Sequence, residues 1–286
     1  MRFCFVEDHR TDYPVRVLCA ALAVSPSGFY AWRSRPESVR AAENRTLLEQ
    51  IRQVHGDSGG RYGSPRVHAV LRSRSIRVGR GRVERLMRYH GVRALVARPR
   101  RVSTTDSRHP FPIAPNLLQR QFTATAPNRV WLADITYLPT SEGWLYLAAV
   151  MDLHTRKIVG WSMRDHLRAE GALAALHMAV QCQKPGPGLI QHSDRGVQYA
   201  CGDYVSALEK AGITPSMSRR GNCLDNAPME SFFHTLKTEL VHHRHYETHD
   251  QARRDVFAYI EGFYNRKRLH SALGYRTPDE MALRAA

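Results

Sequence analysis

The stretch RVWLADITYLPT, residues 129–140, opens the β-rich half of the chain and places Asp134 inside an apolar, β-prone run. Two more strand-like runs follow, WLYLAAVMDL (144–153) and RKIVGWSM (156–163), with separators short enough for hairpins. Helix-like and strand-like segments then alternate: helices over 168–183 and 202–212, and strands over 188–193 and 213–218. Strands followed by alternating helices and strands predict an α/β fold, a mixed sheet with flanking helices.

Three acidic residues stand in three different settings in this half of the chain. Asp134 interrupts the first strand-like run, Asp194 follows another, and Glu230 lies near the start of a helix predicted over 226–240. Three carboxylates brought to one point repel each other unless cations fill the site. Carboxylate oxygens suit Mg²⁺ or Mn²⁺, which take part of their shell from substrate phosphates. The pattern therefore predicts metal-dependent phosphoryl transfer.

Each acid also has an ordinary alternative. Asp134 would be tolerated on the exposed face of an edge strand, although burial without partners is costly. Asp194 fits the turn chemistry of SDRG, and Glu230 suits the first turn of a helix through the helix dipole. However, Asp194 lies where a strand gives way to a loop, and open α/β sheets place their sites outside such carboxyl ends. The joint occurrence of the three acids favours one shared site.

Lys237 lies seven residues after Glu230, nearly two helical turns, so the two side chains project from one face. One interpretation is that Lys237 reaches a DNA phosphate beside the metal site. The alternative is a surface lysine on an amphipathic helix.

Four further polar residues lie near the predicted site. Asp152 and Asp225 are interpreted as structural, at a strand-end turn and a helix N-cap respectively. His192 and Arg195 flank Asp194, and either contact with the scissile phosphate or a structural hydrogen-bonding role fits their position.

The charge balance indicates a polyanionic partner. The chain has 42 Lys and Arg against 26 Asp and Glu, a formal net charge of +16 and a pI near 10.1. Its five cysteines are scattered without a CxxC pair, which favours reduced thiols over disulfides or a zinc finger. The apolar stretch VLCAALAV (17–24) is too short for a membrane span. We therefore expect a cytoplasmic, nucleoid-associated protein with no membrane partner.

The first hundred residues are predicted to be helical. Between Arg61 and Arg101 there are thirteen arginines and a single acid, Glu84. Guanidinium groups match phosphate oxygens, so this block is interpreted as a phosphate-tracking face that includes Arg82, Arg85 and Arg88. A basic surface with no DNA contact is the alternative. The same two alternatives, DNA contact or generic helix packing, apply to the helix pair expected within residues 1–38.

Long motifs occur in a fixed order along nearly the whole chain: SGFYAW, RYGSPRVHAVLR, RVERLMRYHGV, APNLLQRQF, PNRVWLADITYLPTSEGWLYLAAVMDLHTRKIVGWSM, HSDRGVQYA, GNCLDNAPMESFFHTLKTEL and YNRKRLHSALGYRTP. In these motifs the chain resembles the transposases of the IS-three family of bacterial insertion sequences, specifically their second-reading-frame (OrfB) product. The resemblance implies an RNase H-like fold of the retroviral integrase catalytic core type, with a DDE triad. Carried over residue by residue, the triad is Asp134, Asp194 and Glu230, with the family's spacing of 36 positions between the last two and its lysine at Lys237.

The resemblance also implies a mechanism and partners. Two Mg²⁺ (or Mn²⁺) ions per active site would clamp the scissile phosphate, water would free a 3′-OH at an element end, and that hydroxyl would attack another phosphodiester. The expected partners are DNA (transposon ends and target), further copies of the chain as a homo-oligomer on DNA, and a first-frame (OrfA) protein or a fusion with it. The alternatives are a non-catalytic DNA-binding regulator of transposition and an RNase H-type nuclease acting on RNA and DNA hybrids.

The predicted organisation joins small all-α helical DNA-binding regions to an α/β core. It comprises a helix-turn-helix-like segment over 1–38, an arginine-rich helical DNA-binding domain over 44–98, a linker over 99–127, an integrase catalytic core over 128–245 and a C-terminal helical extension over 246–286. Within that extension, residues 250–266 are predicted to form one helix.

Overall fold

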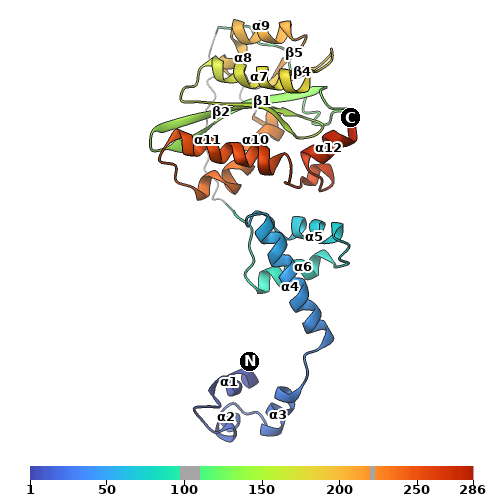
Figure 1. Ribbon diagram of the computed structural model, residues 1–286, viewed down its shortest axis with the longest axis vertical. Helices are drawn as coiled ribbons and strands as arrows, with labels where there is room; N and C mark the ends of the chain where they lie inside the picture. The colour runs from blue at the N-terminus through green and yellow to red at the C-terminus, as the bar shows by residue number, and fades with distance from the viewer. Residues whose placement is uncertain (97–109, 220–222, 286) are drawn as a thin grey trace.

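Three bodies follow one another along the long axis of the molecule (Figure 1). The computed structural model describes residues 1–96, 110–219 and 223–285. A small helical unit at the N-terminus is followed by a second helical unit and by a large α/β body that holds the C-terminus. Of the linker predicted over 99–127, residues 99–109 lie outside the described ranges.

The N-terminal unit consists of α1 (Arg2–His9), α2 (Val15–Ala21) and α3 (Pro26–Ser34). The Ser25 hydroxyl accepts the Gly28 N–H at 2.9 Å and Pro26 occupies the first turn, two features that start a helix. Four buried side chains form a separate core for the unit: Val6, Leu18, Cys19 and Phe29. Among the described residues no single helix is long and apolar enough to cross a membrane; α2 and α3 pass that test only together, across a bend of 111°.

The second unit is built from α4 (Val39–Asp57), α5 (Ser64–Ser73) and α6 (Arg80–Tyr89). Apolar side chains from one face of each helix are buried together: Leu47, Ile51 and Val54 of α4, Val67 and Leu71 of α5, and Val83 and Met87 of α6. These side chains are spaced three or four residues apart, as expected for one face of a helix. Because each helix packs through that face, its basic side chains remain on the surface.

The α/β body contains a five-stranded sheet in the order β3-β2-β1-β4-β5. Its strands within the described residues are β1 (Val130–Thr140), β2 (Gly143–Asp152), β3 (Ile158–Arg164), β4 (Ile190–Ser193) and β5 (Thr214–Met217). β1, β2 and β3 form an antiparallel meander, whereas β4 pairs with β1 and β5 in parallel. The predicted mixed sheet is confirmed, and β1 at its centre joins the antiparallel and parallel halves.

Helices cover both faces of the sheet (Figure 1). On one face lie α7 (Ala169–Gln183), α8 (Val197–Ala200) and α9 (Gly202–Lys210). On the other lie α10 (Ala227–Glu239) and α11 (His249–Phe257), and the chain continues through a π-helical segment (Ala258–Tyr264) to α12 (Pro278–Ala285). Short 3₁₀ turns span Cys223–Asn226, Val241–His243 and Ser271–Leu273. The single helix predicted over 250–266 is therefore α11 followed by a π-helical segment.

Alternation along β1 divides the core of the α/β body into two layers. Trp131 and Ala133 are buried with residues of α7 and α9, whereas Leu132 and Leu138 are buried with residues of α10. Gly160 allows β3 to approach α7 closely, because a Cβ there would lie 2.8 Å from the backbone nitrogen of Ala179. The sheet is thus held tightly on the α7 side, and the opposite face receives α10.

Candidate active site

Strand register brings Asp134 beside Asp194. β1 and β4 run in parallel, with Leu132 paired to His192. Two positions further along each chain are Asp134 and Asp194, so the two aspartates follow the last paired residues of β1 and β4 at the same end. This is the carboxyl end of a parallel strand pair, the place predicted for the site.

The carboxyl group of Asp134 is surrounded by charge. Its pKa is raised well above the usual range, first because burial disfavours the charged form and next because Asp194 and Glu230 add negative charge nearby. The Ile135 N–H, which donates to Asp134 Oδ1 at 2.8 Å, and the Lys237 ammonium group act in the opposite direction. Asp194, Glu230 and Lys237 therefore each lie close enough to Asp134 to affect it electrostatically.

Glu230 reaches this point because the start of α10 is fixed to β1. Glu230 lies in the first turn of α10, and the residue before the helix, Asn226, donates from Nδ2 to the carbonyl oxygen of Ala133 at 3.1 Å. Ala133 directly precedes Asp134. The opposite side of the helix is apolar and buried against the sheet through Met229, Phe232, Phe233 and Leu236.

Asp225 fixes the turn that leads into α10. Its fully buried carboxylate accepts from Arg219 Nε at 3.0 Å and Nη2 at 2.9 Å, from Arg120 Nε at 2.8 Å and from Asn116 Nδ2 at 3.0 Å. The hydrogen bonds from Arg219 are the main reason why the pKa of Asp225 lies well below its usual range. Its structural role agrees with the sequence interpretation, but its expected position as N-cap is wrong, since Asn226 occupies that position.

Lys237 is partly buried and points toward the carboxylates. Its Nζ lies 4.5 Å from the centroid of the Tyr137 ring, a cation–π contact. Burial lowers the pKa of Lys237, while the negative charge of Asp134 opposes that shift. The side chain therefore belongs to the same group of residues as the three acids.

The three acids fit a divalent cation by their chemistry. All supply carboxylate oxygens, and both the burial and the neighbouring negative charge that raise the pKa of Asp134 are unfavourable effects that a bound cation would relieve. Within residues 1–96, 110–219 and 223–285, no three His, Cys, Asp or Glu side chains are close enough together to hold one ion. The acids are thus near one another without being at ligand spacing.

Three of the nearby polar residues have structural hydrogen bonds. His192 is fully buried, with Nδ1 2.9 Å from Ser216 Oγ, and burial lowers the pKa of His192 to about 4. Arg195 Nε donates to the Ser218 carbonyl oxygen at 2.6 Å. Asp152 ends β2 and accepts from the Thr155 N–H and hydroxyl, at 2.8 and 2.7 Å, in the strand-end turn expected for it.

Sequence reasoning missed two aromatic residues beside the acids, Tyr137 and Tyr199. Tyr199 of α8 is buried, and the nearby Tyr204, Asp134 and Asp194 add to the effect of burial in raising the pKa of Tyr199. Both tyrosines belong to motifs that were assigned only to strand or turn formation, so only the pairing of β1 with β4 reveals their proximity to the acids.

Comparisons with known proteins agree with this geometry. Residues 124–223 and 211–278 each match a family described as integrase core domain. The chain is 39% identical over 290 residues to the transposase InsF for insertion sequence IS3A of Escherichia coli (strain K12), which covers 98% of both chains. The chain belongs to the IS3 family of transposases. It is also 44% identical over 261 residues, 91% of this chain and 96% of the relative, to an uncharacterized 31 kDa protein of insertion element IS600 from Shigella sonnei.

Solved structures with a similar chain path include retroviral integrases. A simian T-cell lymphotropic virus intasome, solved in complex with a PP2A regulatory subunit, aligns with a TM-score of 0.48 at 14% identity, over 81% of this chain and 74% of that chain. The catalytic core domain of HTLV-2 integrase in complex with magnesium aligns with a TM-score of 0.42 at 13% identity, over 55% of this chain and 98% of that chain. The fold of this IS3-family transposase is assigned from its sheet order and from the family matches.

In this transposase a family described as HTH-like domain matches residues 42–100, which include α5, α6 and all but the first three residues of α4. The three arginines singled out on α6 are in different situations. Arg82 donates to Asn44 Oδ1 at 2.8 Å and to Glu43 Oε2 at 2.9 Å, so its guanidinium holds α6 against α4. Arg88 is 77% exposed and paired with Glu84 one turn away, and Arg85 is exposed. Arg85 and Arg88 are therefore the accessible members of the predicted set.

We expect Asp225→Asn to destabilise the folded chain in a pH-dependent way. Because the pKa of Asp225 is lower in the folded chain than in the unfolded one, its contribution is complete above about pH 4 and declines as the pH falls further. The free energy of unfolding should drop by about 2 kcal/mol at neutral pH, less than for a fully buried pair because both arginines are partly exposed. Urea unfolding from about pH 7 to about pH 3 measures this difference, which should shrink at the acidic end.

The matched control is Asp203→Asn, which removes an exposed carboxylate on α9. It should stay close to the parent chain at every pH. An Asp225→Asn difference that remained constant down to the lowest pH would contradict the assigned charge interaction.

Proposed function

We propose that this transposase uses Asp134, Asp194 and Glu230 as a DDE triad that holds two Mg²⁺ or Mn²⁺ ions and cuts and joins DNA strands at the ends of an insertion sequence. The observation that supports the proposal is the parallel pairing of β1 with β4, after which Asp134 and Asp194 follow at the same end, together with the hydrogen bond from Asn226 to the Ala133 carbonyl oxygen that holds the first turn of α10, and so Glu230, beside β1. Charges placed in mutual repulsion at the end of a parallel strand pair are typical of a site completed by cations and phosphates.

When bound, the ions would supply Lewis acidity that activates the attacking oxygen and stabilises the leaving 3′ oxygen. The residues of the chain divide the other tasks. Asp134 binds a cation through its ionised carboxylate, and because burial and the neighbouring carboxylates raise the pKa of Asp134, divalent cations and protons compete for it. The hydrogen bond from the Asn226 side-chain amide to the Ala133 carbonyl oxygen holds the start of α10, and therefore Glu230, beside the strand position of Asp134. Lys237 offers its ammonium group to a phosphate of the bound strand.

The reaction balances without an external energy source. Water attacks the scissile phosphorus, one P–O bond forms and the P–O3′ bond breaks, which leaves a 3′-OH on the element. That hydroxyl oxygen then attacks a second phosphodiester and again replaces one P–O bond by another. No covalent protein intermediate is required, and the chain contributes position and charge.

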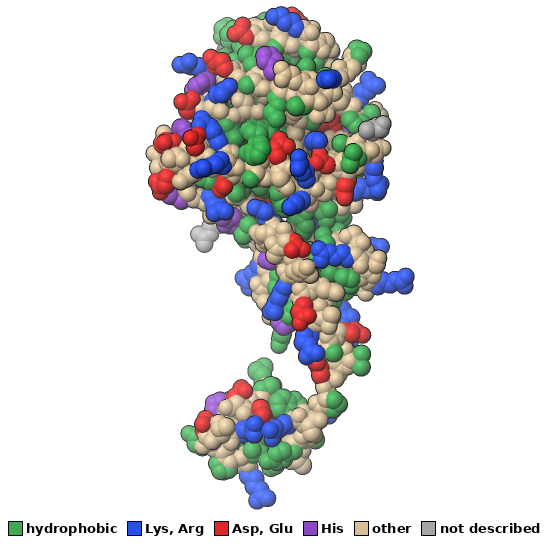
Figure 2. Space-filling model, viewed as in Figure 1, with side chains coloured by type: hydrophobic (Ala, Val, Ile, Leu, Met, Phe, Trp, Pro, Cys, Tyr) green, Lys and Arg blue, Asp and Glu red, His purple; other side chains and the backbone are tan. Residues whose placement is uncertain are grey.

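We propose that DNA binding involves the α4–α6 unit, with a homo-oligomer on the DNA and a first-frame (OrfA) protein, separate or fused, as further partners. Support comes from the net charge of +16, from the HTH-like match and from the exposed Arg85 and Arg88. Figure 2 shows Lys and Arg side chains spread over all three bodies, with acidic side chains between them. Its substrate would place it at the bacterial nucleoid, in the cytoplasm. The alternative of a non-catalytic DNA-binding regulator leaves the grouped carboxylates without a role.

Asp134→Asn, Asp194→Asn or Glu230→Gln should each abolish Mg²⁺-dependent cleavage and joining while DNA affinity is retained. Each change removes the charge of one ligand and almost no volume. The assay is cleavage of a labelled element end by the chain together with its first-frame partner, with Glu209→Gln on the exposed surface of α9 as control. Near-parental cleavage by any one of the three variants would remove that residue from the triad.

Lys237→Ala should reduce cleavage and crosslinking near the element terminus, and Lys237→Arg should restore only part of the activity because guanidinium differs from ammonium in shape and reach. Divalent-metal binding, followed by calorimetry with Mn²⁺, should persist in both variants because the carboxylates remain. Full transposition by Lys237→Ala would show that the lysine has no part in the reaction.

Replacing Arg85 and Arg88 together by Gln should weaken DNA binding to all sequences. In a plot of log affinity against log salt concentration, the slope should become less negative by about 1.8, because each lost phosphate contact changes the slope by about 0.9. A Lys210→Gln, Arg284→Gln chain removes the same charge from α9 and α12 and serves as the control. Equal salt slopes for the two double variants would contradict a specific role for α6.

A further inference from the structure

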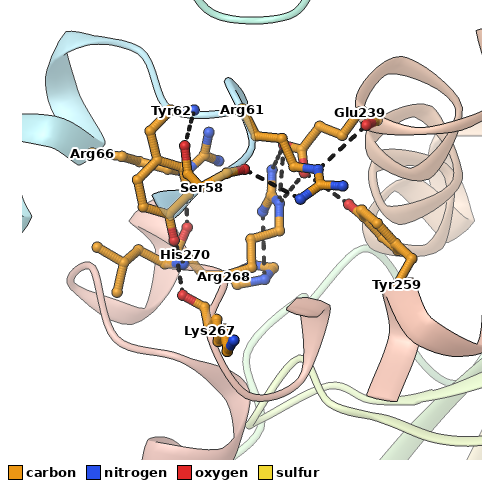
Figure 3. A network of polar contacts seen from close by, with 10 residues as sticks. Ser58, Arg61, Tyr62, Arg66, Glu239, Tyr259, Lys267, Arg268 and His270 are labelled. Carbon is orange, nitrogen blue, oxygen red and sulfur yellow. Dashed lines mark hydrogen bonds and ion pairs between the residues drawn. The ribbon is translucent and has the colours of Figure 1, made fainter. Parts of the chain in front are cut away.

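The loop between α4 and α5 and the first turn of α5 each contribute a side chain that contacts the α/β body (Figure 3). The Tyr62 hydroxyl donates to the Lys267 carbonyl oxygen at 2.8 Å and accepts from the Leu269 N–H at 3.0 Å. Arg66, at the start of α5, donates from Nε to the Leu269 carbonyl oxygen at 2.9 Å. The helical unit is thus hydrogen-bonded to backbone groups about 200 positions away in the sequence.

Arg61 adds a second attachment beside the first. Its guanidinium lies 4.4 Å from the centroid of the Phe263 ring, and its Nε donates to the backbone carbonyl oxygen of Glu239 at 3.4 Å. A further nitrogen of the same group, Nη1, donates to the Ser58 carbonyl oxygen at 3.2 Å. Arg61 therefore connects its own loop, the π-helical segment and the end of α10.

The receiving surface is built around a buried ion pair. Arg268 donates to Glu239 from Nη2 at 2.8 Å and from Nε at 3.0 and 3.1 Å, and the Tyr259 hydroxyl donates to the same carboxylate at 2.8 Å. The side chains of Arg268 and Glu239 are only 6% and 7% exposed. Separating the two groups would leave a buried charge without its partner, which is energetically costly. The ion pair therefore keeps one geometry, and the surface that it supports has a defined shape.

The loop itself is held in one conformation. Gly59 and Gly60 have φ of +62° and +76°, values that glycine adopts without strain. The Ser58 hydroxyl donates to the His55 carbonyl oxygen and accepts from the Tyr62 N–H. The Leu95 N–H donates to the Gly60 carbonyl oxygen, so the segment that follows α6 is tied to the same loop.

Glu239 connects this contact to the active site. It ends α10, whose first turn carries Glu230 and whose last turn carries Lys237. Nine positions of α-helix span about 14 Å. The body that carries Arg85 and Arg88 is thereby attached to the helix that carries one carboxylate of the triad.

We propose that this contact, which we name the module lock (residues 58–66 against Glu239, Phe263 and residues 267–269), fixes the distance between the DNA phosphates held by α6 and the phosphodiester at the carboxylates. Tyr62 and Arg66 are its positioning residues, and their effect is the choice of the phosphodiester that is cut. Successive phosphates on one strand lie about 3.4 Å apart along the duplex axis, so a displacement of that size moves the cut by one nucleotide. The inference rests on the proposed strand cleavage.

The test compares the parent chain with Tyr62→Phe and Arg66→Met, alone and combined. Tyr62→Phe removes two hydrogen bonds and keeps the ring, which should favour the undocked state by about tenfold or more. The DNA is a duplex containing the element end, and the cuts made in Mg²⁺ are mapped at single-nucleotide resolution. The parent should cut one phosphodiester; the variants should also cut its neighbours, with unchanged DNA affinity. Tyr13→Phe, which removes an exposed hydroxyl from the N-terminal unit, should cut like the parent.

A second measurement detects whether the module lock is formed and does not depend on DNA cleavage. Energy transfer between dyes placed through unnatural amino acids at exposed Ser73 of α5 and Asp203 of α9 reports the spread of distances between the two bodies. The distribution should be narrow in the parent and broad in the variants. An unchanged distribution overturns the lock, and a broad distribution with a single cut position overturns its role in choosing the cut. A narrow distribution in a parent chain that cuts no DNA refutes the proposed function itself, and with it that role.

Discussion

Burial of the Asp134 carboxyl group close to the carboxylates of Asp194 and Glu230 is the unfavourable interaction that the rest of the α/β body has to accommodate. A fold that brings these groups together without cations must compensate for the unfavourable charge elsewhere. Favourable contacts hold the approach to α10, where Asp225 is satisfied by two arginines and Asn226 is bonded to β1. The positive charge of the nearby Lys237 acts in the opposite direction and relieves part of what remains. The interactions among the charged groups of the site are therefore unfavourable without cations, whereas the polar residues that lead into α10 have their hydrogen bonds satisfied.

Local pattern was sufficient to predict most of the secondary structure of the α/β body. Alternation along 130–163 predicted the meander, and helical periodicity predicted α7, α9 and α10 close to their observed ends. The pairing of β1 with β4, which places Asp134 beside Asp194, joins segments about 60 positions apart and has no local signature. The family resemblance supplied that grouping. Helix α1 was missed, and α11 with its π-helical continuation was predicted as one helix because periodicity does not distinguish the two.

Partners of charged side chains were the least predictable part of the site. Arg82, Arg85 and Arg88 look equivalent in the sequence, yet Glu43 and Asn44 of α4 engage only the first of them. Asp225 resembles a helix cap, but the groups that satisfy it include Asn116 and Arg120, more than 100 positions earlier. Tyr62 likewise lies in a glycine-rich turn whose contacts are made with residues near the C-terminus. Each of these roles depends on long-range packing that composition and spacing do not encode.

The position of α10 in the chain also affects when the site can exist during synthesis. The N-terminal unit buries its own core, so its residues can pack as soon as they leave the ribosome. The meander follows later, but Glu230 and the Asn226 bond to β1 come from a segment made after all five strands of the sheet. A chain that stops short of α10 thus carries helices that can meet DNA but lacks one of the three acids. The grouping of Glu230 with Asp134 and Asp194 is therefore available only to a chain whose synthesis has passed α10.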